Sequence, residues 1–340
     1  MVGNNTPVFF IRDAIKFPDF IHTQKQNPAT GRPDNNMAWD FWTQQPESFH
    51  QTSILFGDRG TPYGFRHMHG YSSHTFKWVN AEGEQFYVQY TLKTNSGIKN
   101  FTAEESAEMT KTNPNFSKQD LWDSIEAGED VSWTWYIQIM PVAEADTAKF
   151  DVLDITKVWY HADYELIPIG KLVLNRNPEN WFAEVEQSAF SPNNLVPGIE
   201  ASNCKMLQGR LFSYPDTHRH RLGRNYQQMP INNSYRSHVN NYHRDGESRV
   251  DGNSGSSVNY EPNTLGGPAP DPKWAAAKFD VSGQAGRFKY THPNDDFEQP
   301  RKFYREVLDE GAKQRIAENI AGHMADVTLE LKQKALAIYR

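Results

Sequence analysis

The chain has 340 residues, a net charge of −7 and a mean hydropathy of −0.76. This length suffices for one large domain or two smaller ones, and 9 Trp, 15 Tyr and 20 Phe residues supply large apolar faces for a core. The acidic balance and the lack of a long basic run argue against nucleic acid or an anionic membrane as a partner.

The single cysteine excludes an internal disulfide framework, and the sequence contains no apolar run of about 18 residues that would predict a membrane span. Neither a basic stretch nor an apolar segment of the signal-peptide type follows Met1. We therefore expect an intracellular protein.

The first half of the chain contains short aromatic and β-branched runs, whose alternation is typical of strands with one buried face. These runs cover residues 75–79, 86–91 and 133–139, and a further strand pair is predicted at residues 150–159 and 169–174. Gly83 indicates a hairpin turn between the first two runs. A capping box at residues 102–105 predicts a helix to about residue 110, and residues 117–125 predict another.

The second half of the chain is less regular. From about residue 175 to residue 300 the periodicity fades while Asn, Pro, Gly and Ser accumulate, which is typical of a segment that is functional, disordered, or wrapped over a partner surface. In the last forty residues apolar side chains recur at helical spacing, and Gly311 and Gly322 are predicted to separate two or three helices.

One pair of residues suggests chemistry. Arg210 precedes Tyr214 by four residues, so on a helix the two side chains lie on one face and can hydrogen-bond. The permanent charge of the guanidinium favours the phenolate, a hard anionic oxygen ligand for ferric iron. Pro215 biases Tyr214 away from helical geometry. Taken alone, such a pair is most often structural, and His218 with His220 could be a metal pair, although structural metals need three or four ligands.

Residues 210–225, from Arg210 to Asn225, resemble the haem-ligand signature of the monofunctional haem catalases, of the small-subunit, fungal-like kind. The resemblance continues through residues 3–13, 20–25, 39–42 and 318–323. It implies disproportionation of hydrogen peroxide to water and dioxygen in antioxidant defence, haem b as cofactor with Tyr214 as its iron ligand, and a homotetramer in the full-length protein.

The resemblance also implies an α+β fold with a catalase-type antiparallel β-barrel. Residues 1–175 would form the second part of the haem-binding barrel, incomplete on its N-terminal side. Residues 176–300 would be the wrapping segment with the proximal ligand helix, and residues 301–340 the start of a C-terminal helical domain.

Several further residues take roles from the resemblance. Asn4 would hydrogen-bond peroxide, Phe9 would stack near the haem, and Phe17 would narrow the substrate channel. Arg221 resembles an arginine that meets a haem propionate, for which the fork of guanidinium donors is suited.

His74 resembles a histidine that extends the network behind Arg210 and Tyr214, whereas taken alone it would be a core histidine. In many relatives an aspartate completes this network. Cys204 stands at that position here, which leaves the end of the network open.

Many catalases also bind NADPH. The matching positions are His50, Arg59, Tyr71, Lys93, Trp159 and His161. Ile54, Gly57 and His69 depart from the pattern of vertebrate relatives. Because no G-x-G-x-x-G fingerprint occurs, a dinucleotide is expected in a surface cleft and not in a Rossmann fold.

In the family, the distal histidine lies in an R-x-x-E-R-x-x-H-type segment upstream of residues 3–5, and the 340 residues contain no such segment. We therefore expect a truncated form or fragment of a catalase, with the catalytic histidine outside this sequence. The alternatives are a haem-binding fragment without turnover and a non-enzymatic assembly partner. Peroxisome and cytoplasm are the compartments that the resemblance implies, and no targeting signal can be read from this chain.

Overall fold

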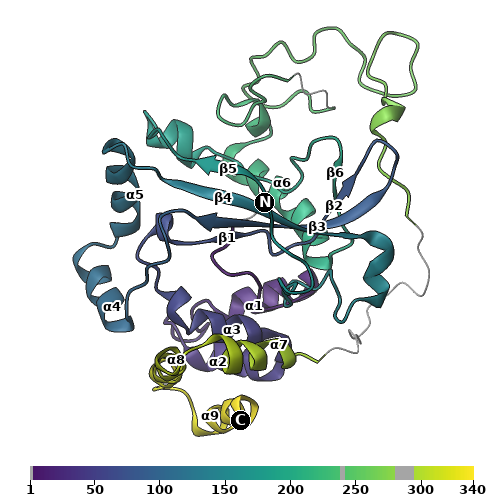
Figure 1. Cartoon of the computed structure of the whole chain (residues 1–340). Coiled ribbons are helices and arrows are strands. Elements are labelled where there is room, and N and C mark those ends of the chain that lie inside the picture. Colours follow the sequence, from purple (N-terminus) through teal and green to yellow (C-terminus); the bar gives the residue numbers. More distant parts are fainter. Residues whose placement is uncertain (1–2, 238–241, 280–294) are drawn as a thin grey trace.

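A six-stranded antiparallel sheet forms the centre of the protein in the computed structural model, which describes residues 3–237, 242–279 and 295–340 (Figure 1). Its strands follow the order β5-β4-β3-β2-β6, and β1 pairs with β3. The strands are β1 (Gly70–Tyr71), β2 (Phe76–Val79), β3 (Gln85–Thr94), β4 (Ser132–Pro141), β5 (Ile167–Val173) and β6 (Ile199–Ala201). Between its edges β5 and β6 the sheet stays open, so the expected α+β fold with an incomplete barrel is confirmed.

The predicted hairpin joins β2 and β3. Val79 lies opposite Gln85, and Gly83 adopts a φ of 84°, in the left-handed region that favours glycine. The Asn80 side chain accepts hydrogen bonds from the backbone N–H groups of Glu82 and Glu84, at 3.1 and 2.8 Å, and so closes the turn.

The α-helices lie outside the sheet, most of them below it in the view of Figure 1. They are α1 (Phe17–Thr23), α2 (Asn35–Gln44), α3 (Phe49–Leu55), α4 (Ala103–Thr112), α5 (Phe116–Glu126), α6 (Lys205–Leu222), α7 (Glu298–Lys302), α8 (Glu310–His323) and α9 (Leu329–Tyr339). The capping box at Thr102 and Glu105 is present and starts α4, as predicted.

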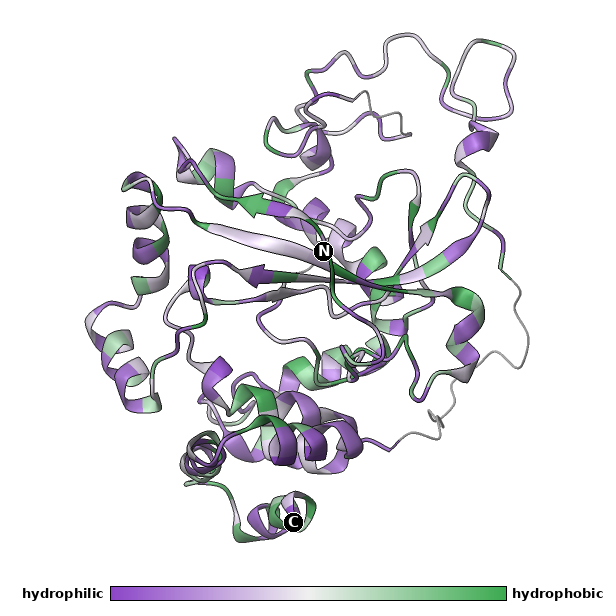
Figure 2. Cartoon of the chain, in the orientation of Figure 1, coloured by the Kyte–Doolittle hydropathy of each residue, from purple (hydrophilic) through white to green (hydrophobic). Residues whose placement is uncertain are grey.

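The C-terminal helices pack on α2 and α3, and each of them carries both hydrophilic and hydrophobic residues (Figures 1 and 2). Trp39 and Trp42 of α2 share a buried cluster with Leu331 of α9. Gly311 does not separate two helices as expected. It lies in the first turn of α8, which Asp309 caps by accepting from the Ala312 N–H.

The predicted strand at residues 150–159 is wrong. This segment is irregular, although Phe150, Val152, Ile155 and Trp159 are buried. Asp151 accepts from the Leu153 N–H and Asp154 from the Thr156 N–H, which makes two consecutive local turns. These side chains compete with a strand ladder for the backbone donors, so within the described part of the chain β5 pairs only with β4.

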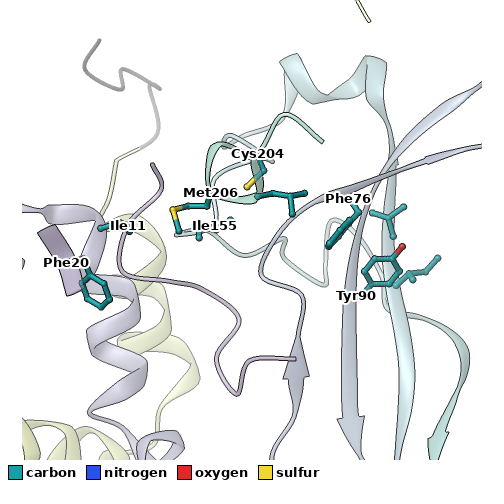
Figure 3. Close-up of a cluster of buried hydrophobic side chains, with 10 residues drawn as sticks. Ile11, Phe20, Phe76, Tyr90, Ile155, Cys204 and Met206 are labelled. Atoms are coloured by element: carbon teal, nitrogen blue, oxygen red, sulfur yellow. The ribbon is translucent and has the colours of Figure 1, made fainter. Parts of the chain in front are cut away.

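The main core joins four parts of the chain that are distant in sequence, one of which is the irregular segment at residues 150–159, through Ile155 (Figure 3). Ile11 and Phe20 come from the N-terminal segment, Phe76 from the sheet, and Cys204 and Met206 from the start of α6 (Figure 3). This shared cluster holds α6 and the N-terminal segment at a fixed place beside the sheet.

Candidate functional site

Helix α6 carries Arg210 and Tyr214 and continues through Pro215, so the local bias of this proline against helical geometry is overridden. Proline lacks the N–H that would bond to the carbonyl four residues earlier, here that of Leu211. Asn193 supplies a donor instead, since its Nδ2 atom lies 2.5 Å from the Leu211 carbonyl oxygen.

Arg210 and Tyr214 meet as the helical spacing predicts. Nη2 of Arg210 donates to the phenolic oxygen of Tyr214, and the guanidinium carbon lies 4.9 Å from the centroid of the tyrosine ring. Both side chains are half-buried. The phenolic oxygen therefore lies beside a fixed positive charge.

His74 lies behind this pair, as the resemblance implied. Its Nε2 atom is 2.8 Å from Nη1 of Arg210, so the guanidinium bonds two partners with two different nitrogens. Burial, followed by the charge of Arg210, lowers the pKa of His74 to about 3, which keeps the ring neutral. Because arginine has only donors, Nε2 must be the acceptor and Nδ1 must carry the proton.

Cys204 completes the chain of contacts. Its sulfur lies 3.5 Å from Nδ1 of His74, and both residues are almost fully buried. Burial raises the pKa of the Cys204 thiol to about 12. The network thus ends at a neutral sulfur that accepts weakly from His74.

Phe9 and Phe17 lie on the N-terminal segment beside α6. Their rings stack with centroids 6.4 Å apart, and Phe9 packs against the core cluster that Leu211 also contacts. A Cβ atom on Gly209 would lie only 2.4 Å from the Cβ of Ala14, so the segment and the helix approach very closely. Asn4 bonds through its backbone to Tyr71 of β1.

Arg221 lies in the last turn of α6. Its guanidinium donates to the backbone carbonyls of Glu186 and Ser188. Sequence reasoning missed this second role and that of Asn193, because backbone acceptors have no signature in the sequence. Only the proline inside the helix could have indicated that Leu211 needs a donor from elsewhere.

Four of the six residues considered for dinucleotide binding interact in one cluster with His69, a position that differs from vertebrate relatives. The four are Arg59, Tyr71, Lys93 and His161. Arg59 donates to the Tyr71 hydroxyl at 3.2 Å. Burial, followed by the charges of Arg59 and Lys93, lowers the pKa of His69 to about 4. Burial, followed by Lys93, also lowers the pKa of His161.

The other two dinucleotide candidates are buried and bonded to the backbone. His50 has 4% of its surface exposed, and its Nδ1 lies 2.9 Å from the Thr156 carbonyl. Trp159 is 2% exposed, and its Nε1 donates to the Val152 carbonyl at 3.3 Å.

The described part of the chain contains no group of three or more His, Cys, Asp or Glu side chains that could hold a metal ion. His218, considered for a metal pair with His220, bonds through Nε2 to the Phe190 carbonyl at 2.7 Å. Within the same residues, no helix has the length and apolar character needed to cross a membrane.

Comparison with known proteins covers almost the whole chain. The model of the family described as "Catalase" matches residues 1–267, and that of "Catalase-related immune-responsive" matches residues 290–340. The chain is 57% identical to Catalase-A of Dictyostelium discoideum over 99% of its length and 68% of the relative's. It is 55% identical to a catalase of Methanosarcina barkeri, over 99% of the chain and 67% of that protein.

Solved structures agree with these matches. A fungal catalase superimposes with a TM-score of 0.93 at 46% identity, covering 99% of this chain and 69% of that one. Catalase A from Saccharomyces cerevisiae gives 0.92 at 44% identity, over 99% and 71%. Since both sequence and fold match over essentially all 340 residues, the chain belongs to the catalase family, haem enzymes that disproportionate hydrogen peroxide.

Proposed function

We propose that Tyr214 is the iron ligand of haem b in this chain. The observation that carries the proposal is the forked contact of Arg210, which joins the Tyr214 oxygen to the neutral ring of His74. The donor set fits the group, because a half-buried phenol held by a fixed cation offers the hard anionic oxygen that ferric iron prefers.

In this proposal, bound haem supplies the iron that reacts with peroxide, and the protein supplies orientation and charge. Arg210 donates to the Tyr214 oxygen and places a permanent positive charge beside it, because a guanidinium stays charged in proteins. His74 accepts one N–H of Arg210 and thereby keeps the second nitrogen directed at Tyr214.

The remaining roles follow the family resemblance. The Asn4 amide would donate to peroxide, and the stacked rings of Phe9 and Phe17 would form an apolar wall that excludes water. Arg221 has five N–H donors, so its two bonds to backbone carbonyls leave others for a propionate.

The test is haem reconstitution of the chain, followed by its absorption spectrum and by oxygen release from hydrogen peroxide. Tyr214→Phe should remove the tyrosinate bands and abolish oxygen release, whereas Tyr235→Phe should change neither, because Tyr235 is 91% exposed. Haem uptake without oxygen would favour a binding fragment, and failure to take up haem would favour an assembly partner. An unchanged spectrum in Tyr214→Phe would refute the ligand assignment.

We also propose that this chain binds NADPH at the cluster of Arg59, His69, Tyr71, Lys93 and His161. Two cationic side chains, Arg59 and Lys93, lie beside two histidines with lowered pKa values and suit the phosphates, including the 2′-phosphate that distinguishes NADPH from NADH. His50 and Trp159 would support the cluster from the core. Binding of NADPH but not NADH by the chain, lost in Lys93→Met, would support this site.

The relatives suggest the cellular setting. One relative, 52% identical, is a peroxisomal catalase of Toxoplasma gondii, and we propose peroxisome or cytoplasm for this chain. We further propose a homotetramer, with residues 1–175 as part of the haem-binding domain, residues 176–300 as the wrapping segment and residues 301–340 as the start of a helical domain.

A further inference from the structure

Residues 186–193, called the strap from here on, run along helix α6 and bond to it at three levels. Asn193 donates to the Leu211 carbonyl at 2.5 Å, the His218 ring bonds to the Phe190 carbonyl at 2.7 Å, and Arg221 donates to two carbonyls of the strap. Leu211 lies three residues before Tyr214 and His218 four residues after it. Both levels therefore lie on the face of α6 that carries Tyr214.

His218 transmits the contact to the tyrosine ring. A carbonyl only accepts, so Nε2 of His218 is the donor to Phe190, and Nδ1 is left to accept from Nη2 of Arg221 at 3.3 Å. This fixed ring is buried, and its centroid lies 6.0 Å from that of Tyr214 in an edge-to-face arrangement. The strap thus sets the place of the side chain against which Tyr214 packs.

Asn193 bonds to α6 at the carbonyl that lacks a helical hydrogen bond. Pro215 leaves the Leu211 carbonyl without its usual helical donor and presses against it, which allows the helix to bend one turn before Tyr214. Water could satisfy this partly exposed carbonyl, but water would not hold it at a fixed place relative to the strap. The side-chain amide of Asn193 does both.

We propose that the strap positions the Tyr214 ring, with Asn193 and His218 as positioning residues. This proposal rests on the proposed function in one respect, because the position of the Tyr214 ring matters for function only if Tyr214 is the haem ligand. The contacts themselves concern the chain without haem, so they can be tested independently of haem binding.

The test is a double-mutant cycle of Asn193→Ala and Pro215→Ala in the 340-residue chain. Tyrosines are labelled with ¹³C at Cζ, the Tyr214 resonance is identified by its loss in Tyr214→Phe, and amide exchange of residues 211–218 is followed by mass spectrometry. Asn193→Ala should shift the Tyr214 resonance and speed amide exchange roughly fivefold, as expected for the loss of one ordinary hydrogen bond.

In the Pro215→Ala background the same Asn193 substitution should have little effect, because residue 215 regains an N–H for the Leu211 carbonyl. Asn194→Ala, at the exposed neighbouring position, serves as the control and should leave both readouts unchanged. Equal effects of Asn193→Ala in the two backgrounds, or no effect in either, would overturn the proposal. Because these measurements use the chain without haem, their outcome does not depend on whether Tyr214 is the haem ligand.

Discussion

At the scale of single residues, Arg210 has the most demanding task in the candidate site. Its two terminal nitrogens serve different partners, with Nη1 2.8 Å from His74 Nε2 and Nη2 donating to Tyr214. The planar guanidinium can donate to both partners from two separate nitrogens, whereas the single ammonium nitrogen of lysine cannot reach both acceptors with good hydrogen-bond geometry. Charge alone is therefore not sufficient at this position.

Arg210→Lys should keep the positive charge but lose one of the two contacts. A hydrogen bond to a charged group contributes about 1.5–3 kcal/mol, so oxygen release by the haem-loaded chain should fall roughly ten- to hundredfold, with weaker tyrosinate bands. Arg219→Lys is the matched control on the exposed side of the same helix. Equal activity of Arg210→Lys and the parent chain would show that charge, and not the fork, matters.

At the scale of elements, α6 is placed by a close approach as well as by hydrogen bonds. Gly209 faces Ala14, and a Cβ atom added to the glycine would lie 2.4 Å from the Ala14 Cβ. The short 3-10 turn Ala14–Lys16 can pack this tightly on the helix only because position 209 has no side chain. This contact sets the spacing between α6 and the segment that carries Phe9 and Phe17.

Gly209→Ala should destabilise the protein, although alanine is the better helix former by about 1 kcal/mol. Overpacking costs about 1–3 kcal/mol, and Ala14→Gly in the same chain should restore the loss. Gly322→Ala in α8 is the control, because nothing lies within 4 Å of its added Cβ, and it should be neutral or stabilising. Denaturant unfolding measures all three, and a stabilised Gly209→Ala would contradict the close approach.

The same elements show how far the sequence alone predicts the structure. The β2–β3 hairpin and the capped start of α4 depend on neighbouring residues and were predicted. The strand predicted at residues 150–159 does not form, because aspartate side chains accept hydrogen bonds from the backbone N–H groups that a strand would use. In the site, helical spacing predicted the contact of Arg210 with Tyr214, whereas the partners of Asn193 and His218 are carbonyl groups, which every residue possesses.

At the scale of the whole molecule, a buried ionic cluster joins segments from both ends of the chain. Arg12 lies 3.2 Å from Asp154 and 3.4 Å from Glu47, and it also pairs with Asp296. Lys157 pairs with the same Asp296 at 3.3 Å. Since each of these charges has an opposite charge as neighbour, the cluster specifies which segments meet, and removal of Arg12 would take an ion-pair partner from Glu47, Asp154 and Asp296 at once.

Two buried histidines make the stability of the molecule depend on pH. Burial lowers the pKa of His50 to about 4, and burial followed by Arg210 lowers that of His74 to about 3. An unfolded histidine titrates near pH 6.5. The unfolded chain therefore binds protons first as the pH falls. Stability is complete above about pH 6.5 and is lost progressively below it, at pH 5 by about 2 kcal/mol for each histidine.

Unfolding by urea at pH 7.5, 6.0 and 5.0 measures this loss. The lowest pH is 5.0 because carboxylates with lowered pKa values, such as Asp34, titrate near pH 4 when unfolded. They therefore change the stability only at more acidic pH. His50→Asn can still donate to the Thr156 carbonyl and has no titrating group, so it should remove the contribution of His50, about 2 kcal/mol at pH 5, and leave the contributions of the other histidines with lowered pKa values. A flat stability profile over this range in the parent chain would mean that the two rings are not held neutral by the fold.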